Sequence, residues 1–176
     1  MENRKMQGKM HKEYFDQCET ALRQGCYLEA VFREYAAIEG RLEALLGVAG
    51  LPCNKYLDKK IRKDIKISHR LKCAKALLKS PLFEKSKLSE KYFEHLKAWI
   101  DKRNQYIHGL YKDEIKYFQR AKDARALAED GLEYSKKLYN EVKRLRRLRK
   151  SKPNMFNDGI ACAEKECKLH PANKNK

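Results

Sequence analysis

The clearest structural signal in the sequence is the run LEAVFREYAAIEGRLEALL at residues 28–46. Apolar residues recur in it at steps of three and four, which places them in one stripe along a helix. These residues are Leu28, Val31, Phe32, Tyr35, Ile38, Leu42, Leu45 and Leu46. Gly47, Gly50 and Pro52 follow, and residues of these types end helices. We therefore predict an amphipathic helix of about 20 residues that buries one face.

Four other segments of the chain show the same helical periodicity. The expected helices cover about residues 14–22, 67–78, 86–110 and 117–150. Ser86 or Ser89 would cap the third of them, since a serine oxygen accepts hydrogen bonds from the first amides of a helix. No segment alternates with a period of two, so we expect no strand. The sequence thus predicts an all-α fold, a bundle of about five helices with mostly short antiparallel connections.

The segments outside these helices differ in composition. Residues 1–11 hold several Met, Lys and Arg without an apolar stripe, and we expect a frayed lead-in there. Residues 50–64 are polar and basic and are expected to form a loop, with at most one short helical turn. After Pro153 no helical stripe remains, which favours a flexible, irregular tail over residues 151–176. The helical domain is therefore expected to span about residues 12–150.

The balance of charge points to the class of partner. The chain of 176 residues has 41 Lys and Arg against 24 Asp and Glu, a formal net charge of +17. Such an excess indicates polyanionic partners, of which nucleic acid is the commonest, although a solvated lysine-rich surface is the alternative. No apolar run approaches the roughly 18 residues of a membrane-spanning helix, and the N-terminal residues lack a secretory signal. We expect a cytoplasmic protein that contacts no membrane and keeps its six cysteines reduced.

Three side chains suited to phosphodiester chemistry lie in the segment KAWIDKRNQYIHGLY at residues 97–111. The His108 imidazole can exchange a proton at neutral pH. The Arg103 guanidinium stays charged and presents a fork that matches two phosphate oxygens. The Asn104 amide can donate to a phosphate oxygen or hold the imidazole in one tautomer. With RNA, a base that removes the 2′-hydroxyl proton creates an internal nucleophile, so cleavage needs no metal.

Helix geometry limits how these three residues can act together. Positions five apart lie roughly 140° from one another around an ideal helix, so Arg103 and His108 cannot share one face fully. Asn104 and His108, four apart, can. A two-fold axis would bring the motif of a second copy alongside, so we expect a homodimer with a composite active site. The alternative is a surface arginine and a histidine near a helix end, where the helix dipole favours cations.

The R-N-x-x-x-H motif of Arg103, Asn104 and His108 resembles the R-x(4–6)-H motif of the HEPN superfamily (higher eukaryotes and prokaryotes nucleotide-binding). The helical stretch of residues 12–150 is also similar to that family's bundle in length and order. The resemblance implies a dimeric, metal-independent endoribonuclease that serves in toxin–antitoxin or phage-defence systems. It implies that Arg103 and His108 are the catalytic pair, that Asn104 is their polar helper, and that no metal or other cofactor takes part.

The sequence departs from one branch of that family. Toxins paired with a nucleotidyltransferase antitoxin resemble R-x(4)-H-x-Y, whereas Gly109 and Leu110 here separate His108 from Tyr111. The departure argues against a nucleotidyltransferase partner, and it leaves an antitoxin of another kind and the nuclease activity open. Two further functions also stay open. One is a non-catalytic RNA- or nucleotide-binding helical module, and the other is an interaction or antitoxin subunit whose basic face docks an acidic protein.

Further residues are expected to bind RNA. Those near the motif are Lys102, Tyr106 and Tyr111. The two tyrosines could stack on bases, with packing in the core as the alternative. The densest basic run, residues 143–150, would grip the phosphate backbone, although cations also gather at helix C-termini because of the dipole. Its expected contacts are Arg144, Arg146 and Arg147.

A cysteine and histidine cluster lies near the end of the chain. Cys162, Cys167 and His170 form C-x4-C-x2-H, and thiolates with imidazole are the ligands that zinc prefers. Only three ligands are local and the close C-x2-C spacing is missing. Unless Cys53 or Cys73 folds nearby, a metal site is not expected.

Overall fold

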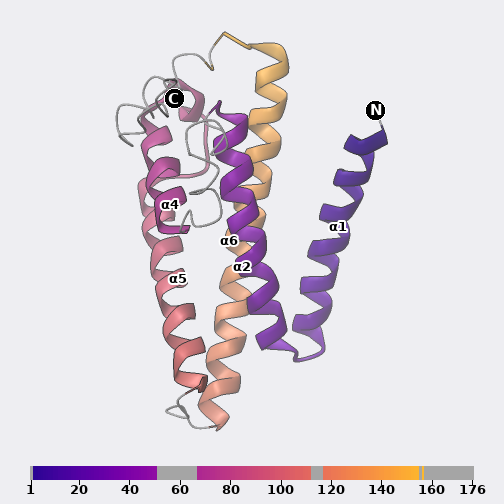
Figure 1. Cartoon of the computed structure of the whole chain (residues 1–176), viewed down its shortest axis with the longest axis vertical. Coiled ribbons are helices and arrows are strands. Elements are labelled where there is room, and N and C mark those ends of the chain that lie inside the picture. Colours follow the sequence, from indigo (N-terminus) through magenta and orange to yellow (C-terminus); the bar gives the residue numbers. More distant parts are fainter. Residues whose placement is uncertain (1, 51–66, 112–116, 155, 157–176) are drawn as a thin grey trace, which may run out of the picture. The chain divides into compact units, whose positions relative to one another are not determined.

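The computed structural model describes residues 2–50, 67–111, 117–154 and 156. Every regular element in these ranges is helical, which confirms the predicted all-α fold. Figure 1 shows the α-helices in chain order along the colour scale. They are α1 (Glu2–Arg23), α2 (Tyr27–Val48), α4 (Ile67–Ala76), α5 (Glu90–Tyr111) and α6 (Tyr117–Ser151), with two 3₁₀ segments, η2 (Leu77–Lys79) and η3 (Pro81–Phe83). None of the described helices combines the length and the apolar character that crossing a bilayer requires.

Helix α2 coincides with the run of strongest apolar periodicity. Much of the predicted stripe is fully buried, including Val31, Ile38 and Leu42. Two of its members differ, since Leu28 is 39% exposed and Phe32 is 44% exposed. These two residues are four positions apart and share one face of the helix. The described part of the chain therefore leaves a small apolar strip uncovered at the start of α2.

Gly25 forms the turn between α1 and α2. Its φ of 75° lies in the left-handed region that glycine adopts at little cost. The Cys26 amide donates to the Ala21 carbonyl (2.8 Å) and the Gly25 amide to the Leu22 carbonyl (3.1 Å). This pair of bonds is the Schellman arrangement, which satisfies the last carbonyls of a helix. The helix predicted over about residues 14–22 lies within α1, and its predicted end is confirmed by the end of α1 at Arg23.

The start of α1 differs from the prediction. The helix begins at Glu2, so the expectation of a frayed lead-in over residues 1–11 is wrong. Glu, Arg, Lys, Met and Gln dominate there, and such straight-chain residues lose little side-chain freedom in a helix. Apolar periodicity detects a buried face. It therefore gives no signal for helical turns in which apolar residues do not recur at helical spacing.

The chain clusters into two compact units. Unit 1 comprises Met1–Ala37 and Ala98–Ser135, and unit 2 comprises Ile38–Lys97 and Lys136–Lys176. Helices α2, α5 and α6 each contribute residues to both units. Each unit has its own set of buried apolar side chains.

Trp99 of α5 lies at the centre of the core of unit 1. It is buried, and its Nε1 donates to the Leu127 carbonyl of α6 at 2.8 Å. Gly131, one turn further along α6, allows the indole to come close. A Cβ at this glycine would lie 2.6 Å from Trp99 Cζ2 and would clash with the buried Glu34 carboxylate of α2. This close contact fixes α5 against α6 within unit 1, just before the part of α5 that carries the motif.

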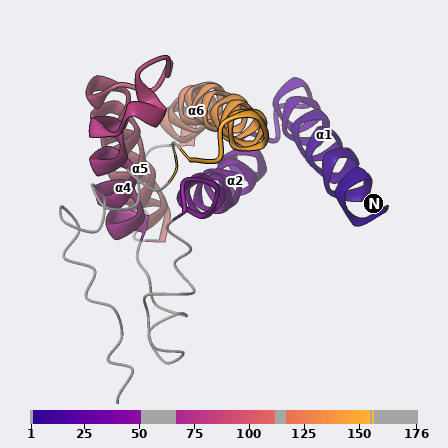
Figure 2. The same cartoon turned by 90° about the horizontal axis from the view of Figure 1, so that it is seen from above.

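Within unit 2, α4 lies alongside the first half of α5 (Figure 2). Lys75 of α4 pairs with Glu94 of α5, with 3.1 Å between Nζ and Oε1. The amide of Tyr92 donates to the Ser89 Oγ at 3.2 Å. Of the two serines predicted as caps, Ser89 is therefore the one that caps α5.

Helix α6 ends at Ser151, close to the predicted end. Phe156 beyond it is 3% exposed, and the Arg149 guanidinium lies 5.6 Å from the centre of its ring. The expectation of a flexible tail from residue 151 onward is therefore wrong for Phe156. One large aromatic side chain can anchor a short segment that has no helical stripe. The rest of the expected tail, residues 157–176, and nearly all of the expected loop lie outside the described residues.

Candidate functional site

Arg103 lies in the second half of α5, within unit 1, against two aromatic rings of α2. Its Cζ is 4.3 Å from the centre of the Tyr35 ring and 5.2 Å from the centre of the Phe32 ring. A guanidinium within about 6 Å of a ring centre is attracted by the negative face of the ring. The two rings thus fix the position of the cation without supplying a negative charge that would neutralise it.

Asn104 is the hydrogen-bond partner of Arg103. Arg103 Nη1 donates to Asn104 Oδ1 at 3.0 Å. Arg103 Nε is buried and has no hydrogen-bond partner among the described residues. Burial lowers the pKa of the Arg103 guanidinium from its ordinary value, but an arginine side chain stays charged at neutral pH. The structure therefore brings these two predicted residues together and keeps the positive charge.

His108 lies four residues after Asn104, so the two side chains share one face of α5. Its side chain is exposed. Within the described part of the chain, it makes no hydrogen bond or ion pair and is not bonded to Arg103. This separation follows from the helix, in which positions five apart point roughly 140° away from each other. In a single copy, Arg103 and Asn104 are paired while His108 stands apart in solvent.

The other residues predicted near the motif differ in their exposure. Tyr106 is 7% exposed, and its hydroxyl donates to the Arg120 carbonyl at 2.7 Å. Burial also raises the pKa of the Tyr106 hydroxyl. The prediction that Tyr106 stacks on bases is therefore wrong, and packing, the alternative, is its role. Lys102 is exposed, and the side chain of Tyr111 lies outside the described part of the structure.

The basic run at the end of α6, in unit 2, contains side chains in two situations. Arg144 Nη2 donates to Glu141 Oε1 and to the Leu82 carbonyl, both at 2.6 Å. Glu141 is buried, and its carboxylate neutralises the charge of Arg144. The bond to the Leu82 carbonyl connects α6 to η3. Arg144 therefore has a structural role, and its contact with phosphate stays a prediction. Arg146 and Arg147 are exposed and stay predicted RNA contacts.

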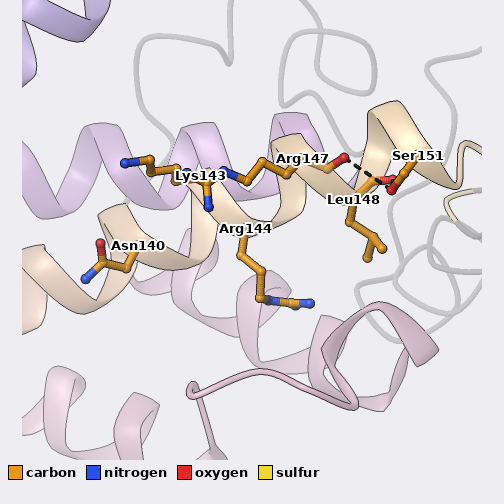
Figure 3. A pocket seen from close by; sticks show the side chains of 6 residues that line it. All are labelled: Asn140, Lys143, Arg144, Arg147, Leu148 and Ser151. Atoms are coloured by element: carbon orange, nitrogen blue, oxygen red, sulfur yellow. Dashed lines mark hydrogen bonds between the residues drawn. The ribbon is translucent and has the colours of Figure 1, made fainter.

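An open groove of about 490 Å³ lies on α6 in unit 2. It is lined by Asn140, Lys143, Arg144, Arg147, Leu148 and Ser151. In Figure 3 the side chains of Lys143 and Arg147 lie along the helix, while Arg144 extends away from it. The lining residues that the structure describes include Lys and Arg but no acidic residue. The groove is therefore a concentration of positive charge.

Sequence reasoning missed Phe32 and Tyr35 at the motif and Asn140 at the groove. It assigned Phe32 and Tyr35 to the buried stripe of α2 and gave them no part in the site, because no local pattern links them to Arg103. For the groove a signal is present. Asn140 and Lys143 precede Arg147 by seven and four positions, which is the spacing of one helix face.

The described residues hold no group of three or more His, Cys, Asp and Glu side chains placed to bind a metal ion. The C-x4-C-x2-H cluster of Cys162, Cys167 and His170 lies outside them. Arg103, Asn104 and His108 themselves supply a guanidinium, an amide and an imidazole group.

Comparisons with other proteins give no match. No protein-family model matches the sequence, and no curated protein or solved structure matches it either. The resemblance of Arg103, Asn104 and His108 to the HEPN motif therefore stays a prediction.

Proposed function

We propose that the protein is a metal-independent endoribonuclease of the HEPN type, active as a cytoplasmic homodimer. The observation that carries the proposal is the arrangement at the end of α5. A stacked Arg103 with its charge intact is bonded to Asn104, and an exposed His108 follows one turn later. A cation near the phosphate and a titratable base are the groups that cleavage of RNA by its own 2′-hydroxyl requires.

The reaction divides between the imidazole and the guanidinium. Neutral His108 of one copy removes the 2′-hydroxyl proton, and the 2′-oxygen attacks the adjacent phosphorus. The bond from phosphorus to the 5′-oxygen breaks, and protonated His108 of the partner subunit gives that oxygen its proton. The products are a 2′,3′-cyclic phosphate and a 5′-hydroxyl. Arg103 stabilises the negative charge that develops on the phosphorane, and the Asn104 amide holds a phosphate oxygen or the imidazole.

The surface next to the motif supports a dimer. Phe32, whose ring lies under the Arg103 guanidinium, is 44% exposed, and Leu28 on the same face of α2 is 39% exposed. Large apolar side chains exposed together are typical of surfaces that another protein covers. A second copy that packs here would bury the two side chains and set two copies of the motif against each other.

Such a nuclease would act as a toxin or a phage-defence effector, and an antitoxin would restrain it. A host in which expression arrests growth should recover when His108 or Arg103 is replaced, if cleavage of RNA causes the arrest.

The direct test is cleavage of labelled tRNA and mRNA in EDTA by the wild type and by His108→Ala. We expect the rate to fall by about a hundred- to ten-thousand-fold, because the variant lacks its proton-transfer group. His95→Ala is the matched control, since His95 is also an exposed histidine of α5 but lies outside the motif. Wild-type cleavage by His108→Ala would overturn the proposal.

The composite site has a test of its own. Arg103→Ala and His108→Ala are each expected to be inactive. A mixed dimer keeps one Arg103 and one His108 in a shared centre, and water can take the place of the one imidazole that is missing. Mixing the two variants should therefore restore part of the cleavage activity. No restoration in dimers shown to be mixed would argue against a shared centre.

The rival function is a non-catalytic RNA-binding module, which the basic groove on α6 favours. This function predicts tight, salt-sensitive binding of RNA without any new 2′,3′-cyclic phosphate ends. End-group analysis of RNA incubated with the wild type separates the two functions.

A further inference from the structure

The groove on α6 is separate from the motif. It belongs to unit 2, whereas Arg103, Asn104 and His108 belong to unit 1. We propose that this groove binds the phosphate backbone of RNA through Lys143 and Arg147. The inference goes beyond the proposed nuclease and does not depend on it.

Lys143 and Arg147 are placed to hold phosphates. They are four residues apart, so they share one helix face and are about 6 Å apart along the axis. Both side chains are exposed, and no acidic side chain of the described residues pairs with either. Like charges at this spacing repel each other on a helix. A bound polyanion relieves that repulsion and supplies a counter-charge that no described residue supplies.

Arg144 gives the groove its shape without serving as a ligand. Glu141 and the Leu82 carbonyl hold its guanidinium. The side chain extends away from α6 and forms one wall of the groove (Figure 3). Because these bonds are made within the protein itself, they hold the wall independently of RNA. Such preorganisation reduces the ordering that binding would otherwise require.

The length and the lining of the groove favour RNA over an acidic protein. Its lining runs from Asn140 to Ser151, which is about 16 Å along an ideal helix, more than one phosphate group occupies. Among the described residues of the lining, Leu148 is the one with an apolar side chain. Protein interfaces depend on buried aromatic or apolar anchors, which this lining does not offer. A nucleic-acid backbone needs cations and amide donors, which Lys143, Arg147 and Asn140 supply.

The test measures binding of an RNA that cannot be cleaved. A 2′-O-methyl oligonucleotide of about 20 nucleotides has no 2′-hydroxyl to attack, so its affinity reports binding alone. We compare the wild type with Lys143→Gln/Arg147→Gln over a range of salt concentrations. Loss of two phosphate contacts should reduce the salt slope by about 1.4 and weaken binding by about 25-fold at 0.1 M salt.

The matched control is Lys91→Gln/Lys97→Gln. These two lysines are exposed on the part of α5 that belongs to unit 2, and they lie outside the groove. Their substitution removes the same net charge as the groove variant does. The control should bind RNA within about twofold of the wild type, because overall charge acts weakly at a distance in 0.1 M salt. Circular dichroism of both variants checks that the helices are intact.

Two results would overturn the inference. Equal weakening in the groove variant and in the control would mean that net charge attracts RNA and the groove does not. Absence of RNA binding by the wild type, with capture of an acidic protein that Lys143→Gln/Arg147→Gln abolishes, would assign the groove to protein docking. Cleavage by His108 is measured separately, on unmodified RNA, so failure of this inference and failure of the nuclease proposal can be told apart.

Discussion

Arg103 in unit 1 and Arg144 in unit 2 are both partly buried arginines, but the groups that contact their guanidinium differ. Arg103 stacks on the ring of Tyr35, and no carboxylate among the described residues pairs with it. Arg144 is bonded to the buried carboxylate of Glu141. A ring fixes a cation and leaves its charge in place, whereas a carboxylate cancels it. The first arrangement suits a cation that acts on an anion from outside, and the second suits a cation that holds helices together.

Among the substitutions that test this comparison, Arg103→Lys should have the largest effect, which is on the rate of RNA cleavage. It keeps the positive charge and removes the planar fork. A lysine cannot stack on Tyr35 in the same way or bind two phosphate oxygens side by side. We expect the rate of RNA cleavage to fall by about a hundredfold, or roughly 3 kcal/mol of transition-state stabilisation. Arg125→Lys, at an exposed pair with Glu129, is the control. If both variants cleave RNA equally fast, stacking of Arg103 has no part in the reaction.

Glu141→Ala tests Arg144. It should lower the stability of the fold by an amount between the losses known for exposed and for fully buried ion pairs. The change removes a buried acceptor and leaves the Arg144 guanidinium, which is 30% exposed, without its counter-charge. We expect the free energy of unfolding to fall by about 2 kcal/mol, between the values for exposed and fully buried pairs. Urea denaturation measures it. Glu129→Ala breaks an exposed pair and should cost less than about 0.5 kcal/mol. If Glu141→Ala and Glu129→Ala lower the free energy of unfolding equally, burial of Glu141 does not strengthen its pair with Arg144.

The smallest effect is expected from Tyr35→Leu, which keeps an apolar side chain under Arg103 but removes the ring. A cation–π contact of about 1 kcal/mol corresponds to a roughly fivefold loss in kcat/KM for RNA cleavage. Tyr35→Phe keeps the ring and should cleave RNA at nearly the wild-type rate. Tyr139→Leu removes the ring under Arg41 in unit 2 and serves as the control. A loss in Tyr35→Phe as large as in Tyr35→Leu would assign the effect to the hydroxyl.

Local patterns in the sequence were sufficient for most helix limits. The predicted helix over residues 117–150 matches α6 (Tyr117–Ser151), along which a buried stripe runs from Ala124 to Leu145. The prediction failed where no stripe exists, at the start of α1, and where one side chain anchors the chain, at Phe156. Apolar periodicity indicates which face of a helix is buried. It gives no signal for helical turns without such a pattern, or for a single side chain that anchors a segment.

The site was predictable only in part, for a related reason. The spacing of Arg103, Asn104 and His108 is local and can be read directly. Burial of Tyr106 and support of Arg103 by the rings of α2 depend on which helices meet, and this is a property of the packed fold. An aromatic residue in an apolar stripe looks the same whether it packs on leucine or on arginine.

The buried indole of Trp99 has a practical consequence, because it belongs to the chain's single tryptophan. Its fluorescence changes when unit 1 opens, whereas far-ultraviolet circular dichroism follows the helices of both units. Coincident midpoints in urea would mean that the two units unfold as one cooperative block. An earlier change in fluorescence would show that the unit with the Arg103 motif opens first, and a spectrofluorometer alone would then measure the stability of that unit.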